Sequence, residues 1–303
     1  MKKLLIIVLA LVALLVVIFI GVSAYLGYSM TRVERIPVIG NPGQYGLDYE
    51  AVSFTSLYKD LTLRGWFLPA PGSDKVIIMV HGNGHNRNDP EIGMLDIAAR
   101  LVEHDFNVLM FDLHGFGESD GNTVSGGYYE KEDVKGAVAY ISERGFNNIG
   151  VLGFSLGAVA SLLAAAEDEQ IDAVVADSSF ADLNDIMEPE FAKRTKAPKF
   201  FLRPILYMIK LMFGVDFAAI RPVEAVPEIA PRPVLFIHGG LDDMIPPEHA
   251  RRLYEASASP DNLLWLVPEC GHTRAFQERP EEFISWVTSF FEEALTGYLV
   301  KSP

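Results

Sequence analysis

The alternation of short apolar runs with helical patterns constrains the fold of this chain more than any other feature. Apolar runs typical of buried strands occupy residues 76–80, 107–111, 149–152, 173–176, 234–237 and 263–267. Helical patterns lie between and after them, at residues 91–103, 130–144, 155–166, 247–256 and 280–295. Such alternation predicts a mostly parallel sheet that is covered by helices on both faces. Ligands of these sheets bind at the carboxyl ends of the strands.

Two further runs precede this series. Residues 49–56 and 61–68 are predicted to form an antiparallel pair of strands, and the first run shows alternating apolar residues. With about 270 residues after the N-terminal segment, the chain has the length of one α/β domain with an ordinary core. We therefore predict a single sheet of about eight strands.

The first 30 residues stand apart from that domain. Lys2 and Lys3 are followed by an uncharged, mainly aliphatic run from Leu4 to Met30, which as a helix would be about 40 Å long. Because the hydrocarbon core of a bilayer is about 30 Å thick, residues 1–30 are predicted to form a transmembrane anchor. A cleaved signal peptide is the alternative, since Val22-Ser23-Ala24 offers small residues suited to cleavage. The length of the apolar run favours the anchor.

The basic N-terminus indicates an orientation. A short positive segment before the first apolar helix is typical of a tail that stays in the cytoplasm. Residues 31–303 would then form a domain on the extracytoplasmic side of a single-pass membrane protein. Cleavage of a signal peptide would instead release that domain as a secreted protein.

Charge and cysteine content narrow the function classes. The formal net charge is −15, and all 40 acidic residues follow the apolar segment. A nucleic-acid partner is not expected, because such proteins carry a basic footprint. Cys270 is the single cysteine, so no intrachain disulfide can form, and no spacing of Cys and His indicates a zinc site. The sequence leaves the oligomeric state open.

The stretch Gly153-Phe154-Ser155-Leu156-Gly157 lies between a predicted strand and a predicted helix. A serine at that point sits on a tight turn, and glycines two residues before and after it remove Cβ atoms that would clash. Its hydroxyl would lie beside the helix N-terminus, where developing negative charge is stabilised. The five-residue pattern alone is weak, and a glycine-rich packing turn is the alternative. The strand–turn–helix context favours Ser155 as a nucleophile.

A nucleophilic serine needs a histidine to accept its proton and a carboxylate to orient that histidine. His272 is predicted as the base, because it follows the last strand at the ligand-binding edge. Asp242, which follows the penultimate strand, is predicted as the acid, with Asp243 and Asp177 as alternatives. The order Ser, Asp, His is the one expected for this kind of turn. The remaining histidines are assigned to loop or helix positions: His81, His85, His104, His114, His238 and His249.

Acyl transfer also needs backbone donors for the oxyanion of the tetrahedral intermediate. The N–H of Leu156, directly after the serine, is the first predicted donor. The loop His81-Gly82-Asn83-Gly84 follows the first central strand and lets the backbone approach a substrate closely. The N–H of Asn83 is the second predicted donor, with a plain turn as the alternative for this loop.

Together these motifs resemble the α/β-hydrolase family of serine hydrolases. The resemblance covers residues 50–295 and rests on the His81 loop, the glycine-rich turn from Asp112 to Ser119, the Ser155 turn, Asp242 and Gly271-His272, all in family order. It implies an eight-stranded, mostly parallel sheet, no cofactor, and a Ser155–His272–Asp242 triad. Asp112 to Ser119 resembles a loop that is more structural than catalytic. With its N-terminal segment, the chain looks like the small membrane-anchored members of the family.

About 55 residues separate the strand that ends near Asp177 from the one that starts near Val234, which is long for a connection. They include the apolar stretch 200–213, and residues 181–230 are predicted to form a helical lid. An ordinary helix packed on the core is the alternative. As a lid, the stretch would present an acyl-binding or membrane-facing surface, with Lys199, Arg203 and Lys210 reaching toward headgroups.

The sequence thus predicts a serine hydrolase that cleaves carboxylic esters or thioesters through an acyl-enzyme, with acyl or lipid-like substrates near a membrane. A serine peptidase or amidase that uses the same triad is the enzymatic alternative. A non-catalytic, membrane-tethered binding protein is the alternative from another class. The presence of a competent residue in each triad role speaks against it.

Overall fold

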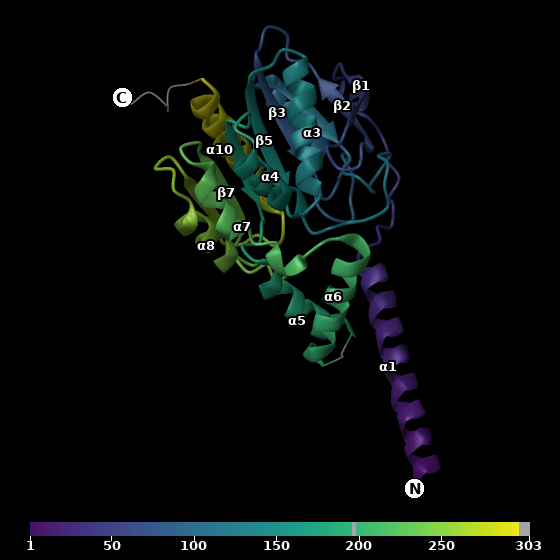
Figure 1. The fold of residues 1–303 in the computed structure, drawn as a ribbon. Helices are drawn as coiled ribbons and strands as arrows, with labels where there is room; N and C mark the ends of the chain where they lie inside the picture. Colours follow the sequence, from purple (N-terminus) through teal and green to yellow (C-terminus); the bar gives the residue numbers. More distant parts are fainter. Residues whose placement is uncertain (196–197, 297–303) are drawn as a thin grey trace.

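Eight strands form one sheet at the centre of the computed structural model, which describes residues 1–195 and 198–296. Their order is β1-β2-β4-β3-β5-β6-β7-β8 (Figure 1). β1 pairs antiparallel with β2 and β2 antiparallel with β4, whereas the other pairings are parallel. The strands are β1 (Glu50–Thr55), β2 (Thr62–Leu68), β3 (Lys75–Val80), β4 (Asn107–Phe111), β5 (Asn148–Phe154), β6 (Ala173–Asp177), β7 (Val234–Gly239) and β8 (Leu263–Val267). The predicted mostly parallel sheet and its antiparallel opening pair are confirmed.

Helices cover both faces of this sheet. On one face lie α3 (Glu130–Glu143), α4 (Leu156–Glu167) and α8 (Glu248–Ala256), which share an apolar cluster with alternate strand residues. On the other lie α2 (Met94–Glu103) and α10 (Pro280–Leu295). Because both faces are packed, β4, β6 and β7 are buried at every position. This double burial explains why the strands read as continuous apolar runs in the sequence.

The start of the helix predicted at 91–103 differs most from the structure, whereas the other predicted helix boundaries agree to within one residue. The pattern at 91–103 predicts a helix from residue 91, but α2 begins at Met94. Gly93, directly before it, has a φ of 83°, in the left-handed region that a right-handed helix excludes. The chain therefore turns sharply at Gly93 before the helix starts.

The long interval between β6 and β7 forms a helical layer beside the sheet domain, which we call the cap. It contains α5 (Leu183–Thr195), α6 (Leu202–Phe213) and α7 (Pro222–Ala225), with short 3₁₀ turns at η2 (Lys199–Phe201), η3 (Phe217–Ala219) and η4 (Val226–Ile229). Its core is a separate apolar cluster that includes Ile205, Ile209 and Phe217. The expected lid range includes 196–197 and the expected domain range ends at 303, so residues 196–197 and 297–303 of those predictions lie outside the described residues.

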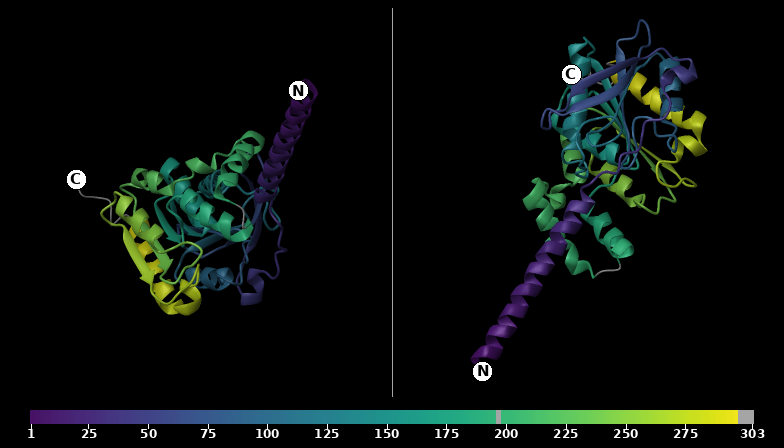
Figure 2. Two further views of the ribbon diagram at one scale, coloured as in Figure 1. Left: turned by 90° about the horizontal axis from the view of Figure 1, so that it is seen from below. Right: turned by 90° about the vertical axis from the view of Figure 1, so that its right-hand side faces the viewer.

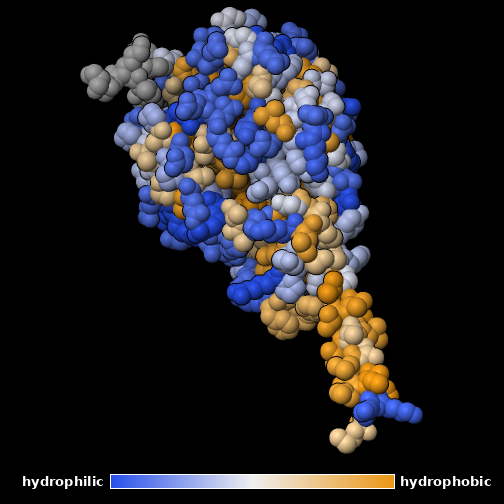
Figure 3. Space-filling view, viewed as in Figure 1, coloured by the Kyte–Doolittle hydropathy of each residue, from blue (hydrophilic) through white to orange (hydrophobic). Residues whose placement is uncertain are grey.

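The helix α1 (Lys2–Met30) projects away from the sheet domain on the side of the cap (Figures 1 and 2). It is long and apolar enough to cross a membrane, and its most apolar stretch is not covered by the rest of the protein. Figure 3 shows this helix as a hydrophobic rod next to a largely hydrophilic body. A short 3₁₀ turn, η1 (Pro42–Tyr45), follows on the way to β1, and α9 (Ala275–Glu278) precedes α10.

Candidate active site

Ser155 occupies the turn between β5 and α4 in a strained backbone conformation. Its φ of 52° and ψ of −114° lie outside the regions that non-glycine residues favour. A Cβ on Gly153 would meet the Gly157 carbonyl, and one on Gly157 would meet the Val80 carbonyl on β3. The two glycines therefore allow a turn that lifts the serine above the carboxyl edge of the sheet at the N-terminus of α4.

The structure brings Ser155, His272 and Asp242 together from the ends of three strands. His272 Nε2 lies 2.9 Å from Ser155 Oγ, and His272 Nδ1 lies 2.7 Å from Asp242 Oδ2. Asp242 follows β7 and is buried, His272 follows β8 and its side chain is 18% exposed, and Ser155 is half-buried. The carboxylate is therefore shielded while the serine and the imidazole remain open to a substrate. This geometry can move a proton from the hydroxyl to Nε2.

The Asp242 carboxylate is held in its ionised form. Oδ1 accepts the N–H groups of Met244 and Ile245, at 3.0 and 2.8 Å. His238 Nε2 lies 3.3 Å from Oδ2, in addition to the His272 contact. Burial alone would raise the pKa of Asp242, but the hydrogen bonds from His238, His272 and the backbone outweigh it and hold that pKa well below its usual range. A permanently charged acceptor fixes the proton of His272 on Nδ1 and leaves Nε2 free to accept another.

The two alternative acids occupy different positions. Asp243 is exposed on the same turn as Asp242. Asp177 is buried at the end of β6, where its backbone carbonyl accepts the Ser155 N–H at 2.8 Å and its Oδ1 accepts the Ser178 hydroxyl at 2.8 Å. Its Oδ2 is buried without a hydrogen-bond partner among the described residues. Burial raises the pKa of Asp177 to about 6, despite the hydrogen bond from Ser178.

The predicted oxyanion donors lie on either side of the serine. Leu156 is the first residue of α4, and the first N–H groups of a helix have no partner within it. Gly82 packs against Ser155, because a Cβ on Gly82 would lie 3.4 Å from the serine Cβ. Asn83 is the next residue and is exposed in the turn. The N–H of Asn83 thus stays a predicted donor whose loop lies beside the nucleophile.

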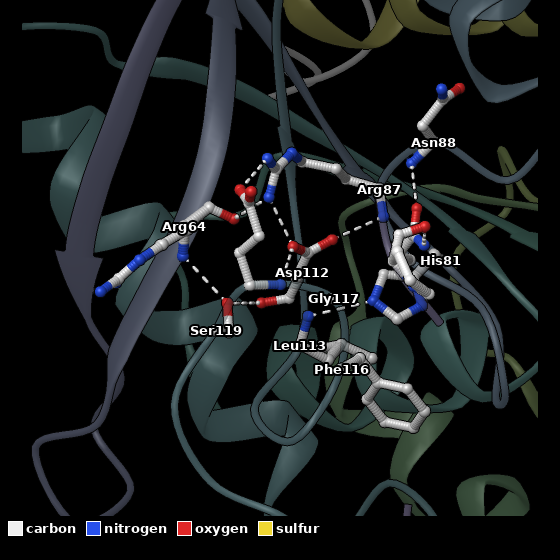
Figure 4. Close-up of polar contacts among 12 residues, drawn as sticks. Arg64, His81, Arg87, Asn88, Asp112, Leu113, Phe116, Gly117 and Ser119 are labelled. Carbon is white, nitrogen blue, oxygen red and sulfur yellow. Dashed lines mark hydrogen bonds and ion pairs between the residues drawn. The ribbon is translucent and has the colours of Figure 1, made fainter. Parts of the chain in front are cut away.

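His81 ties this loop to the glycine-rich turn after β4. Its Nδ1–H donates to the Gly82 carbonyl at 2.7 Å, and its Nε2 accepts the Leu113 N–H at 3.1 Å (Figure 4). Burial lowers the pKa of His81, which agrees with the neutral ring that this acceptor role requires. The side chain is fully buried and therefore shapes the loop from below.

Sequence reasoning missed Arg87, which joins the same two loops by a buried ion pair. Its guanidinium donates to Asp112 Oδ2 at 2.5 Å, and its backbone N–H donates to Asp112 Oδ1 at 2.7 Å (Figure 4). The Glu118 N–H also donates to Oδ2, at 2.8 Å. Arg87 is 4% exposed and lies 4.3 Å above the Trp66 ring. The sequence feature that could have indicated such a cation is Asp112, because a carboxylate that directly follows a buried strand is itself buried and needs a positive partner.

The other histidines serve structural contacts. His114 is buried against Asp133, with its Nδ1 2.6 Å from the carboxylate, and His249 accepts the Ala181 N–H at 3.1 Å. His85 pairs with Asp89 at 3.1 Å, and His104 ends α2. Within residues 1–195 and 198–296, no group of three or more His, Cys, Asp or Glu side chains is arranged to hold a metal ion.

The fold and these motifs define the class of protein. A model of the alpha/beta hydrolase family matches residues 77–286, and the chain belongs to this family. The protein YfhR of Escherichia coli strain K12 is 30% identical over 239 residues, which cover 76% of this chain and 75% of YfhR. Polyketide transferase ATR5 of Stachybotrys chlorohalonatus is 24% identical, covering 81% of this chain and 97% of ATR5.

Solved structures of other proteins show the same fold. The esterase Pf2001 of Pyrococcus furiosus is similar to this chain with a TM-score of 0.73 and 27% identity, over 87% of this chain and 99% of the esterase. The chain is therefore an alpha/beta hydrolase with esterase and transferase relatives. Its single N-terminal apolar helix fits the membrane-anchored members of the family.

Proposed function

We propose that this protein is a membrane-anchored serine hydrolase that cleaves carboxylic esters or thioesters. The observation that carries the proposal is the continuous chain of contacts from Ser155 Oγ through His272 to Asp242, at 2.9 and 2.7 Å. The similarity to an esterase supports the choice of ester over amide substrates. The exposed apolar side chains of the cap, such as Phe200 and Leu211, favour acyl or lipid-like groups.

The proposed reaction has two acyl-transfer steps. Ser155 Oγ attacks the carbonyl carbon while His272 Nε2 takes the hydroxyl proton, and the N–H groups of Asn83 and Leu156 hold the oxyanion. The tetrahedral intermediate collapses, His272 gives its proton to the departing alcohol or thiol, and the acyl group remains on Ser155. Water then attacks the acyl carbon while His272 takes a proton from it, the bond between the acyl carbon and Ser155 Oγ breaks, and His272 returns the proton to Oγ as the free acid leaves. Asp242 stabilises the imidazolium in both steps. The proposed reaction requires no cofactor.

The proposed organisation follows from α1. Residues 1–30 form the anchor, and residues 31–303 form the hydrolase domain, with the cap inserted over about 181–230. Lys2 and Lys3 favour a cytoplasmic N-terminus, which places the hydrolase domain on the extracytoplasmic side. Mass analysis of the protein purified from membranes tests the anchor against a cleaved signal peptide. A mature protein that lacks residues 1–24 would exclude the anchor.

A fluorophosphonate probe tests the chemistry. We expect a covalent adduct on Ser155 in the full-length protein and none in Ser155→Ala, whose kcat for a soluble ester should fall by about 10⁴- to 10⁶-fold. Ser161→Ala is the matched control, because Ser161 lies six residues further along the chain on α4, almost two turns away, and its hydroxyl donates to the Gly157 carbonyl at 2.6 Å. A folded wild-type protein without an adduct would make the chain a non-catalytic binding protein.

Transfer of the acyl group to an acceptor other than water is a second candidate. The similarity to polyketide transferase ATR5 favours it, because the same acyl-enzyme can be attacked by an alcohol or an amine. Product analysis with a soluble ester and added alcohols separates the two reactions. Free acid as the sole product indicates hydrolysis. Matched ester and amide substrates in the same assay distinguish an esterase from an amidase or peptidase.

A further inference from the structure

The cap packs directly on the membrane-facing helix. The rings of Phe19 on α1 and Phe201 at the start of α6 are 5.5 Å apart, and those of Tyr28 and Phe213 at the other end are 6.4 Å apart. Between these contacts, a Cβ on Gly27 would lie 3.0 Å from Ile209 Cγ1. α6 therefore runs parallel to α1 along its last third, as Figures 1 and 2 show.

These contacts fix the level of α6 relative to the anchor. Phe201 lies opposite Phe19 and Ile209 lies opposite Gly27, so both helices advance by eight residues, or about 12 Å. Tyr25 and Tyr28 are exposed near the end of the apolar helix, where tyrosines lie at the membrane–water interface. Phe19 is about 9 Å further along the helix from Tyr25, toward the bilayer centre. The start of α6 then lies below the interface as well.

Large apolar side chains make up much of the exposed surface of this segment. Phe200, Tyr207 and Leu211 are 65%, 62% and 61% exposed, whereas Leu202, Ile205 and Ile209 are buried on the opposite side. An open groove of about 530 Å³ runs between Phe201 and the aliphatic face of α1 from Val12 to Val22. In water this surface would be a large hydrophobic patch beside an already exposed helix. Exposing such a patch to water costs free energy, and that cost is removed if the patch lies in the hydrocarbon next to α1.

The exposed charges on and beside α6 are cations and ion pairs. α6 contains no acidic residue, and its cations Arg203 and Lys210 are exposed on long stems that can reach headgroups. Lys210 also pairs with Asp216 at 2.5 Å, and Lys199, directly before Phe200, pairs with Glu188 at 3.1 Å. At the level where α1 ends, a pocket of about 300 Å³ is lined by Arg32 and Lys59, among others. Arg32 lies 4.2 Å over the Tyr28 ring and Lys59 Nζ lies 4.8 Å over the Tyr58 ring. Within the described residues neither cation pairs with a carboxylate, and Arg32 Nε is buried without a hydrogen-bond partner. Lipid phosphates would lie at this level.

We propose that α6 is an interfacial membrane helix, by which we mean a helix that runs alongside α1 and enters one leaflet of the bilayer at its starting end. It lies in the same leaflet as the end of α1, with Phe200 and Phe201 in the hydrocarbon and with Arg32 and Lys59 at the level of the lipid phosphates. The partner of this surface is the bilayer itself, because the surface continues that of a helix built to lie in lipid. The inference rests on the proposed anchor and does not depend on catalysis by Ser155.

Depth measurements on the full-length protein in phosphatidylcholine–phosphatidylglycerol vesicles test this placement. Cys270 is buried and burial raises the pKa of its thiol to about 11, so an introduced surface cysteine carries the spin label. Labels would be placed at Phe200→Cys, at Val12→Cys on the anchor and at Leu57→Cys on the β1–β2 turn. Leu57 is the matched control, since it is exposed to a similar degree (57%) on the sheet domain.

The readout is the ratio of collisions with oxygen, which concentrates in hydrocarbon, to collisions with a water-soluble nickel chelate. We expect a high ratio at Val12→Cys and Phe200→Cys, a low ratio at Leu57→Cys and an intermediate ratio at Leu211→Cys. A high ratio at Val12→Cys with a low one at Phe200→Cys would overturn the interfacial helix and leave the anchor intact. A low ratio at both would overturn both.

Two further outcomes are informative. A label at Phe200→Cys that is shielded from both reagents and broadened by a neighbouring label would show a second copy of the chain in place of lipid, and would overturn the proposal. Hydrolysis of a soluble ester by the same variants reports on the proposed function separately. A normal depth profile in a protein without activity would therefore reject the enzyme and retain the membrane helix.

Discussion

Two regions at the carboxyl edge of the sheet differ in the exposure of their polar side chains. In the loops after β3 and β4, Arg87, Asp112 and His81 are buried and bond mainly to each other and to the backbone (Figure 4). In the loops after β5 and β8, Ser155 and His272 lie partly open, above a carboxylate that is shielded.

The difference separates scaffold from chemistry. A buried network of charge-assisted hydrogen bonds favours one arrangement, so it fixes where the His81 loop lies relative to the serine. An open serine and imidazole hold their hydrogen bonds ready for exchange with a substrate. Changes in the first region should therefore act on stability, and changes in the second on rate.

The largest expected effect is on rate, from Asp242→Asn. An amide at this position would donate a hydrogen bond to Nδ1 and place the imidazole proton on Nε2, where it blocks acceptance of the serine proton. We expect kcat for a soluble ester to fall by about 10⁴-fold. Asp243→Asn is the matched control, because Asp243 is exposed on the same turn. A large loss of rate from the control, with little loss from Asp242→Asn, would assign the acid to Asp243.

The next largest effect is on stability, from Arg87→Ala. This change leaves the fully buried Asp112 without its cation and should cost about 3 to 5 kcal/mol of unfolding free energy. Arg100→Ala removes an ion pair to Glu281, which is 83% exposed, and should cost less than about 1 kcal/mol. Urea unfolding of the detergent-solubilised proteins measures both. Equal losses from the two variants would show that the buried network does not hold the fold.

Part of this division could be read from the sequence. The strands were predictable because burial on both faces produces continuous apolar runs, and Ser155 was predictable because its glycines fit one turn geometry. Arg87 could not be paired with Asp112 in advance, since a side chain gives no sign of which loop it meets across the sheet edge. The packing of α1 on α6 was hidden for a similar reason. Apolar faces indicate burial without naming the partner.

The smallest expected effect is at Asp177, which ends β6 in the second region, between the strands that precede Ser155 and His272. Burial raises its pKa in the folded protein to about 6, from an ordinary value of 3.8, so the folded state binds a proton more tightly than the unfolded state does. This contribution is fully present below about pH 4 and is lost as the pH rises to about 6, by about 3 kcal/mol at most. Asp177→Asn cannot titrate. The unfolding free energy of the wild type relative to this variant should therefore decrease between pH 4 and pH 7.

Asp105→Asn separates this effect from general charge effects. Asp105 is exposed after α2 with a φ of 60°, a conformation that asparagine also tolerates. A change with pH in the difference between wild type and variant that Asp105→Asn shows as well would be a general charge effect and would not be specific to Asp177. A pH-independent difference for Asp177→Asn would mean that Asp177 ionises normally in the folded protein. Its carboxylate would then be stabilised in the folded protein as well as it is in water, in spite of its burial.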